Sequence, residues 1–134
     1  MNYLLDTHIL IWALMNRPEL SGKARRLIED RANRIFYSTV SVWEISIKHQ
    51  LHPQGIPCSG EDVLRWCEAS DFLNLSLQNG HIPMLETLRR KDGAPPHREP
   101  FDRMLMAQAA AENLIFLTHD KLLSFYLGVR IEMV

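Results

Sequence analysis

The sequence lacks the features that mark disulfide-rich, membrane-spanning or strongly basic proteins. Its two cysteines, Cys58 and Cys67, match no zinc or redox spacing. Cys67 falls on the apolar side of an expected helix, so we expect it to be buried as a small hydrophobic residue. No apolar run approaches the roughly 20 residues that a membrane-spanning helix needs, and the apolar stretch 9–15 is too short for a signal peptide and has no basic leader. We therefore expect a reduced, cytoplasmic setting and no membrane partner.

The chain also has no excess of either charge, because its formal net charge is −1. The whole surface is thus not attractive to polyanions. Its 134 residues are 46% apolar and 23% charged, which predicts one globular domain over 1–134. Basic residues do cluster locally. Arginine matches phosphate geometry, but a solvated helix face is the interpretation we favour for these clusters, which comprise Arg25, Arg26, Arg31 and Arg34, and then Arg89, Arg90 and Lys91.

Strand-like and helix-like patterns alternate along the chain. Strands are expected at 2–6, 34–38, 72–77, 114–118 and 129–134. Helices are expected at 8–15, 22–30, 40–51, after the capping box Ser59–Asp62, and at 80–90, 101–113 and 121–126. The Pro-rich segment 91–100 is the longest irregular stretch. This alternation, with nearly continuous apolar strands, predicts an α/β fold whose parallel sheet is covered on both faces.

Two acidic residues follow strands that lie far apart in the chain. Asp6 ends the first expected strand, and Asp120 lies just past the fourth. Ligands of open α/β sheets bind outside the carboxyl ends of the strands. Each residue alone could simply cap the helix that follows it, but both are expected at the same edge of the sheet. Together they predict a site there.

Glu44 interrupts an apolar stripe in the helix 40–51, where Val40, Ile47 and Leu51 recur at helical spacing. Burial of a lone carboxylate is costly unless it is paired or binds a metal. The alternative is an i,i+4 pair with Lys48 on an exposed face. The apolar neighbours of Glu44 make an exposed face the weaker interpretation, so we favour a functional carboxylate.

Asp102 lies in the first turn of the helix 101–113, directly after the Pro-rich segment. An acid in this position also favours the helix dipole. Several acids with few histidines among them suit hard cations, Mg²⁺ or Mn²⁺, and disfavour zinc. Such a site activates water and neutralises charge on a phosphoryl group. The sequence thus predicts a catalytic metal site at Asp6, Glu44, Asp102 and Asp120.

Four segments spread over nearly the whole chain read, in order, YLLDTHILIWAL, SVWEISIK, EPFDRMLMAQA and IFLTHD. Together, and in this order, they resemble the PIN-domain ribonucleases, and most closely the VapC-like toxins of type II toxin–antitoxin pairs. The chain departs from the common pattern at Glu99, where Asp is usual; this position lies outside the acidic quartet.

The resemblance implies a three-layer α/β/α fold with a five-stranded parallel sheet of order 3-2-1-4-5. It implies an Mg²⁺- or Mn²⁺-dependent endoribonuclease, an RNA substrate, a cognate antitoxin and a homodimer. Asp6, Glu44, Asp102 and Asp120 match the family's acidic quartet, and the supporting positions are Thr7, Thr118 and Arg103.

Three alternatives remain open from the sequence. A PIN-fold nuclease could act in RNA processing or on DNA. A receiver-like module could bind metal without hydrolysis, although receivers carry an acidic pair after the first strand, whereas Asp6 stands alone before Thr7. A non-catalytic partner-binding domain could use the acids only as helix caps, although all four motif positions keep their acid.

Overall fold

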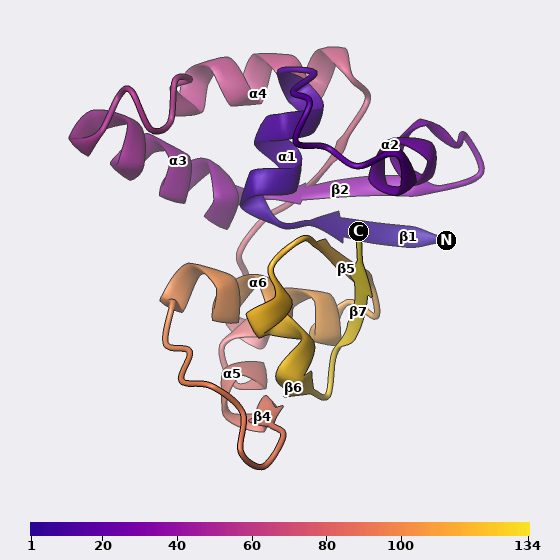
Figure 1. The fold of residues 1–134 in the computed structure, drawn as a ribbon, viewed down its shortest axis with the longest axis vertical. Helices are drawn as coiled ribbons and strands as arrows, with labels where there is room; N and C mark the ends of the chain where they lie inside the picture. The colour runs from indigo at the N-terminus through magenta and orange to yellow at the C-terminus, as the bar shows by residue number, and fades with distance from the viewer.

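The computed structural model describes all residues 1–134, and its main element is a five-stranded parallel sheet (Figure 1). The strands lie in the order β3-β2-β1-β5-β7, which is 3-2-1-4-5 when the five are numbered along the chain. The predicted α/β fold and strand order are therefore confirmed. The strands are β1 (Asn2–Leu5), β2 (Arg34–Ser38), β3 (Leu73–Leu75), β5 (Ile115–Thr118) and β7 (Arg130–Met133).

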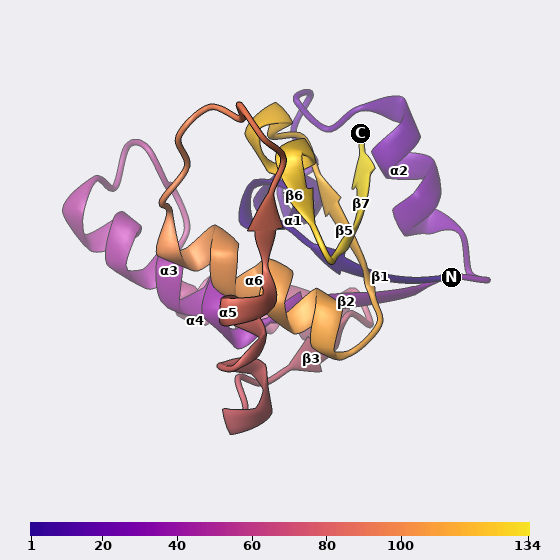
Figure 2. The ribbon, with the colours of Figure 1, turned by 90° about the horizontal axis from the view of Figure 1, so that it is seen from below.

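Helices cover both faces of the sheet, as Figures 1 and 2 show from two directions. One face carries α1 (Thr7–Leu14), α2 (Gly22–Glu29), most of α3 (Thr39–Leu51) and α4 (Gly60–Ala69). The other face carries α6 (Pro100–Ala111), and the short α5 (Met84–Thr87) packs against α6.

Two hydrophobic clusters fill the space between these layers. Tyr3 and Leu5 of β1 belong to one cluster, and Leu4 belongs to the other. In β5, Ile115 and Leu117 belong to the first cluster, and Phe116 belongs to the second. Successive side chains of a strand point to opposite faces, so an uninterrupted apolar strand supplies both cores. The sheet is therefore buried on both faces, as its sequence predicted.

Short polar side chains begin several helices, as expected from their residue types. Asp6 caps α1 and Ser21 caps α2. Ser59 and Asp62 form the predicted capping box of α4. These caps fix where each chain segment turns from strand or loop into helix.

The predicted helix at 80–90 is wrong. The segment is divided between a 3₁₀ turn at Asn79–His81, the short α5, and β4 (Arg89–Arg90), which pairs antiparallel with β6 (Tyr126–Leu127). Pro83 has no backbone N–H and stands at the start of α5. The pairing of Arg89 and Arg90 with a strand far along the chain is a tertiary contact that local periodicity does not encode.

Two further elements are smaller than expected. The predicted helix at 121–126 is a 3₁₀ helix over Lys121–Phe125, followed directly by β6. The third strand covers only Leu73–Leu75 of the predicted 72–77, because it is an edge strand paired with β2 alone.

Both cysteines are free and buried, as predicted for Cys67. Burial raises the pKa of the Cys67 thiol to about 12, so this side chain behaves as an apolar group at neutral pH. None of the helices has the length and apolar character required to cross a membrane.

Candidate metal centre

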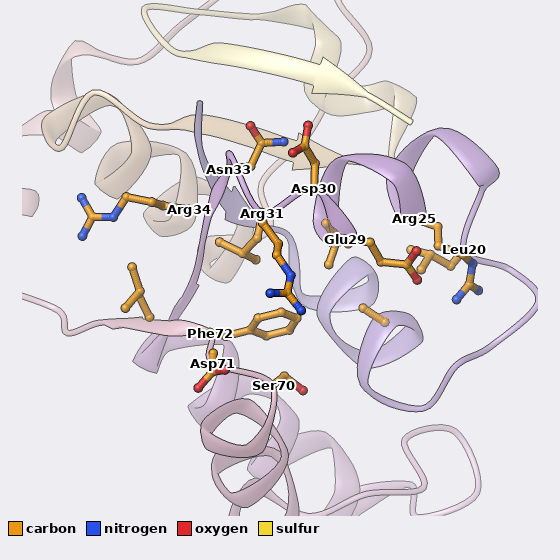
Figure 3. A pocket seen from close by; sticks show the side chains of 14 residues that line it. Leu20, Arg25, Glu29, Asp30, Arg31, Asn33, Arg34, Ser70, Asp71 and Phe72 are labelled. Atoms are coloured by element: carbon orange, nitrogen blue, oxygen red, sulfur yellow. The ribbon is translucent and has the colours of Figure 1, made fainter.

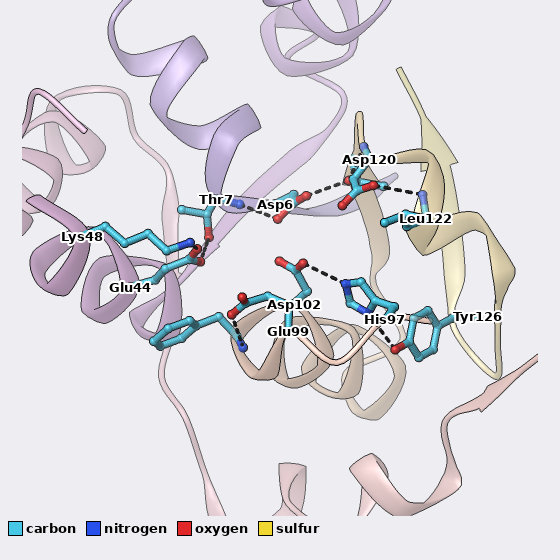
Figure 4. Close-up of polar contacts among 12 residues, drawn as sticks. Asp6, Thr7, Glu44, Lys48, His97, Glu99, Asp102, Asp120, Leu122 and Tyr126 are labelled. Carbon is cyan, nitrogen blue, oxygen red and sulfur yellow. Dashed lines mark hydrogen bonds and ion pairs between the residues drawn. The ribbon is translucent and has the colours of Figure 1, made fainter. Parts of the chain in front are cut away.

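The centre of the site lies where β1 and β5 end side by side. Leu5 pairs in register with Leu117, so the residues that follow, Asp6 and Thr118, are neighbours. The Asp6 backbone N–H donates to the Leu117 carbonyl at 2.9 Å. The Thr118 hydroxyl donates to Asp6 Oδ2 at 2.7 Å and accepts the Asp120 N–H at 3.1 Å (Figure 4). One hydroxyl thus links two of the predicted acids.

Asp6 is held on its other oxygen as well. Its Oδ1 accepts the Thr7 backbone N–H at 2.8 Å, and the residue is only 6% exposed. Burial raises the pKa of Asp6, while the hydrogen bonds from Thr118 and Thr7 oppose that shift. The carboxylate is therefore fixed in orientation but is electrostatically expensive to charge.

Glu44 reaches the same place from α3, which begins immediately after β2. It is 3% exposed; its Oε1 accepts the Thr7 hydroxyl at 2.7 Å, and its Oε2 accepts the Lys48 ammonium (Figure 4). Burial lowers the Lys48 pKa, but the hydrogen bond and charge of Glu44 outweigh it and leave that pKa raised. The buried carboxylate and the i,i+4 pair, which the sequence presented as alternatives, coexist.

The apolar stripe used to predict Glu44 burial is only partly real. Leu51 of that stripe is 68% exposed, and Trp43, the residue before Glu44, is 56% exposed, so the expectation of apolar, buried neighbours is wrong at these two positions. Glu44 is buried because the first half of α3 packs between α1 and α6. The burial of Glu44 was therefore predicted correctly, although some of the apolar neighbours on which the prediction rested are exposed.

Asp102 enters from the opposite side, in the first turn of α6. Its side chain is 16% exposed, and its Oδ2 lies 3.2 Å from His97 Nε2. The other nitrogen of that ring, Nδ1, lies 2.8 Å from the Tyr126 hydroxyl (Figure 4). Burial raises the pKa of Asp102 to about 8, with further contributions from the charges of Asp6, Glu44, Glu99 and Asp120. Burial and the neighbouring negative charges thus both disfavour the charged form of Asp102.

These side chains line one cleft of about 490 Å³ at the carboxyl ends of β1 and β5. Ligand atoms of His97, Asp102 and Asp120 lie within 4.8 Å of one another. Carboxylate oxygens that converge in this way suit a hard divalent cation, which would also relieve the repulsion that raises the Asp102 pKa. The cleft is lined by Asp6, His8, Trp12, Glu44, Lys48, His97, Glu99, Asp102, His119 and Asp120.

The structure brings all four predicted acids to this cleft. Thr7 and Thr118 do not line it but are buried behind it, bonded to the acids. Arg103 follows Asp102 in α6 but does not line the cleft. Glu99, noted in the sequence only as a local departure, does line it and also accepts the Phe101 N–H at the start of α6.

Several lining residues were not identified from the sequence. His97 was not among the candidate site residues, and its contact with Tyr126 depends on the antiparallel pairing of β4 and β6. Trp12 lies in an apolar helix, so nothing in the sequence around it indicates a place in the cleft. The position of His97 in the Pro-rich loop, five residues before an acid, was the one available hint.

A larger hollow, of about 660 Å³, lies elsewhere, between α2, the start of β2 and the start of β3 (Figure 3). Its walls mix three arginines (Arg25, Arg31 and Arg34) with three acids (Glu29, Asp30 and Asp71). The charges of opposite sign leave no net field for a polyanion. This agrees with the interpretation of the first basic cluster as a solvated surface, and the chemistry is expected in the smaller cleft.

Comparison with known proteins agrees with this geometry. Among solved structures, VapBC2 from Rickettsia felis, bound to a DNA fragment from its promoter, matches with 17% identity over 99% of this chain and 98% of the other, at a TM-score of 0.71. DNA-bound VapBC from Salmonella typhimurium matches with 19% identity over the same shares, at 0.69. VapBC-5 from Mycobacterium tuberculosis, a member of the VapBC family of toxin–antitoxin systems, matches with 18% identity over the same shares, at 0.58. At these identities the likeness establishes the fold.

Sequence comparison with curated proteins finds no significant match. The family model of the PIN domain, however, matches residues 3–125, which is most of the chain and includes all four acids of the cleft. This protein therefore belongs to the PIN-domain family.

Proposed function

We propose that this protein is a divalent-metal-dependent endoribonuclease and acts as the toxin of a type II toxin–antitoxin pair. One observation carries the nuclease proposal: acids from distant parts of the chain converge in one cleft, where burial, together with the charges of the neighbouring acids, raises the Asp102 pKa to about 8. Such an arrangement destabilises the fold unless a cation occupies it. PIN domains are generally nucleases, and the matching family model covers this cleft.

Asp6, Asp102 and Asp120, with Glu44, would hold Mg²⁺ or Mn²⁺. When bound, the ion would supply a water of lowered pKa and positive charge beside the scissile phosphate. These acids come from the end of β1, from α3, from the start of α6 and from the residues just after β5. A site built on rigid elements keeps its oxygens in place through the reaction.

The remaining polar groups of the site position these acids. Thr118 and Thr7 hold both oxygens of Asp6, so its carboxylate cannot rotate away. Lys48 and the Thr7 hydroxyl hold Glu44 in the same manner. Tyr126 orients His97, whose Nε2 lies against Asp102 Oδ2. Each acid thus reaches the cleft with its direction fixed before a substrate binds.

The nuclease proposal is tested by incubating unpaired RNA, duplex RNA and single-stranded DNA with the protein in Mg²⁺, in Mn²⁺ and in EDTA. We expect cleavage of RNA in either metal and none in EDTA, because the acids repel phosphate without a cation. Asp6→Asn should lose nearly all activity while it stays folded. Asp92→Asn, which removes an exposed acid outside the cleft, is the matched control and should cleave normally.

If Asp6→Asn cleaves at the wild-type rate in a preparation free of other nucleases, the site is assigned wrongly. Cleavage of DNA in preference to RNA would be compatible with the proposed metal site but would contradict RNA as the substrate.

The toxin proposal rests on the similarity to VapBC structures and implies an antitoxin partner and a homodimer. Co-expression with the product of an adjacent small reading frame should yield a stable complex and suppress RNA cleavage. Light scattering of the isolated protein should give twice the 15.6 kDa chain mass at micromolar concentration. A monomer at that concentration would contradict the homodimer.

A further inference from the structure

One wall of the acidic cleft is aromatic. Trp12 is the only hydrophobic residue among the ten that line the cleft, and His8 and His119 lie on either side of it. The His8 and Trp12 ring centroids are 5.9 Å apart, and those of Trp12 and His119 are 5.7 Å apart in an edge-to-face arrangement. We call these three side chains the aromatic wall.

The backbone fixes the aromatic wall beside the acids. His8 follows Asp6 by two residues and lies one helical turn from Trp12 on α1, so these two rings share a face of the helix. His119 directly precedes Asp120. Its Nδ1 lies 2.6 Å from the Val134 backbone oxygen, so Nδ1 carries the donated proton and Nε2 remains free. A ligand at the acids is therefore within reach of these rings.

The aromatic wall is not simply part of the core. Trp12 packs against the hydrophobic cluster beneath α1 but remains half-buried, whereas Ile9 and Leu10 of the same helix are fully buried. His8 and His119 are both exposed. Trp12 thus offers part of its indole to the cleft, and the two histidines that flank it are accessible.

The charges of the cleft leave the aromatic wall as the main source of affinity from the protein itself. Five of the ten lining residues are carboxylic acids, and the only lysine or arginine is Lys48, which is already paired with Glu44. No unpaired lysine or arginine of the cleft is available to bind phosphate. A nucleotide must therefore be held by a bound cation at its phosphate and by some other contact at its base.

We propose that the aromatic wall binds an unpaired nucleobase adjacent to the phosphate held at the acids, with Trp12 as the stacking surface. This proposal rests on the proposed nuclease function and specifies its substrate. Stacking on aromatic rings tolerates any base but requires a free base face, which a duplex does not provide. The substrate is therefore RNA that is single-stranded at the cleaved step.

The surface beside the aromatic wall allows a strand to continue. His8 and Trp12 also line an adjoining hollow of about 290 Å³, whose far side is formed by Arg17, Glu19 and the loop 54–57. A chain of nucleotides that stacks on Trp12 can pass from the acids into this second hollow. The aromatic wall therefore borders both hollows, so a strand bound at the acids can extend past it.

The test compares adenosine 5′-monophosphate with ribose 5-phosphate, which carries the same phosphate and sugar but no base. Neither contains an internucleotide bond, so equilibrium dissociation constants can be measured by calorimetry in Mn²⁺ and in EDTA. Wild type should bind the nucleotide roughly 5- to 100-fold more tightly than the sugar phosphate. Trp12→Ala should reduce this ratio to near one, and Trp12→Phe should keep most of it.

Two further variants control for folding and position. His119→Ala removes an exposed ring that does not contribute to the core, and should reduce the ratio severalfold. Trp43→Ala removes another exposed tryptophan, which does not line the cleft, and should leave the ratio unchanged.

The outcomes separate this proposal from the nuclease proposal. A wild-type ratio of one, or a ratio unchanged in both Trp12→Ala and His119→Ala, contradicts base binding by the aromatic wall. This holds even if RNA is cleaved and ribose 5-phosphate binds only with Mn²⁺, in which case the nuclease proposal stands without the aromatic wall. A ratio that depends on Trp12 supports the aromatic wall even in EDTA or where RNA is not cleaved, in which case the nuclease proposal fails alone.

Discussion

Thr118 and Asp6 are joined by a hydrogen bond of 2.7 Å across the ends of two neighbouring parallel strands, although 112 residues separate them in the chain. The same Thr118 oxygen accepts the Asp120 N–H at 3.1 Å. A single buried hydroxyl therefore sets the spacing of two acids of the proposed metal centre.

Replacement of this hydroxyl by a methyl group should loosen both acids. Thr118→Val keeps the shape and β-branching of the side chain but leaves Asp6 buried with one partner fewer, so we expect a loss of about 1–2 kcal/mol in unfolding free energy. The Asp6 pKa should rise, because this hydrogen bond is the largest influence that lowers it. Urea unfolding and Mn²⁺ titration measure the two effects.

Thr87→Val provides the matched control for Thr118→Val. Its hydroxyl is exposed and donates to the Met84 carbonyl in α5, far from the acids. We expect a change within about 0.5 kcal/mol and unaltered metal affinity. Equal effects of the two substitutions would contradict a special role for Thr118.

The Asp102 carboxyl makes the stability of the metal-free protein depend on pH. Burial and the surrounding acids raise its folded-state pKa from 3.8 to about 8. Between these values the folded state binds more protons than the unfolded state, so the unfolding free energy should fall as pH rises through this window. Asp102→Asn carries no charge and should lack this contribution.

Melting temperatures in EDTA from pH 5 to pH 9 test this dependence. Near pH 5, wild type and Asp102→Asn should melt within a few degrees of each other, and near pH 9 the variant should melt higher. Asp92→Asn, an exposed acid outside the cleft, should follow wild type throughout. Parallel curves for wild type and Asp102→Asn would show that the Asp102 carboxyl is not strained.

The ion pair between Lys48 and Glu44 should stabilise the metal-free protein. Lys48→Met leaves the Glu44 carboxylate buried with only the Thr7 hydroxyl as a partner. The Lys48 side chain is 38% exposed, which weakens the pair, so we expect a loss of about 1–2 kcal/mol in unfolding free energy. Combination with Glu44→Gln, which removes the charge, should restore most of it.

A double-mutant cycle of these two substitutions in EDTA measures the coupling directly. Lys121→Met, at an exposed lysine that forms no ion pair, should change stability little. Additive effects of Lys48→Met and Glu44→Gln would mean that the pair contributes nothing to stability.

Divalent metal should stabilise the folded protein by mass action. At a Mg²⁺ concentration 100 times the dissociation constant, the unfolding free energy should rise by about 2.7 kcal/mol. Asp6→Asn should show a smaller rise, while Asp92→Asn should match wild type. Thermal melts over a magnesium titration provide the measurement, and a wild type that does not respond to Mg²⁺ or Mn²⁺ would argue against the metal centre.

The sequence alone determined the alternation of strands and helices, and with it the α/β class. Strand β1 is apolar throughout because both of its faces are buried, and this pattern is local. The positions of Asp6 and Asp120 at strand exits were likewise visible, because the chain leaves each strand directly at or just before the acid. The strand order came from the family resemblance, not from the periodicity of the residues.

Tertiary structure alone decided the contacts that join distant segments. The pairing of Arg89 and Arg90 with β6 replaced a helix that the local pattern favoured, and it brought Tyr126 to His97. Trp12 lies in an apolar helix, and only the fold shows that it also lines the acidic cleft. Local periodicity reports which face of an element is apolar, but which segments meet at the end of a sheet depends on long-range packing, and the chemistry of the cleft arises where they meet.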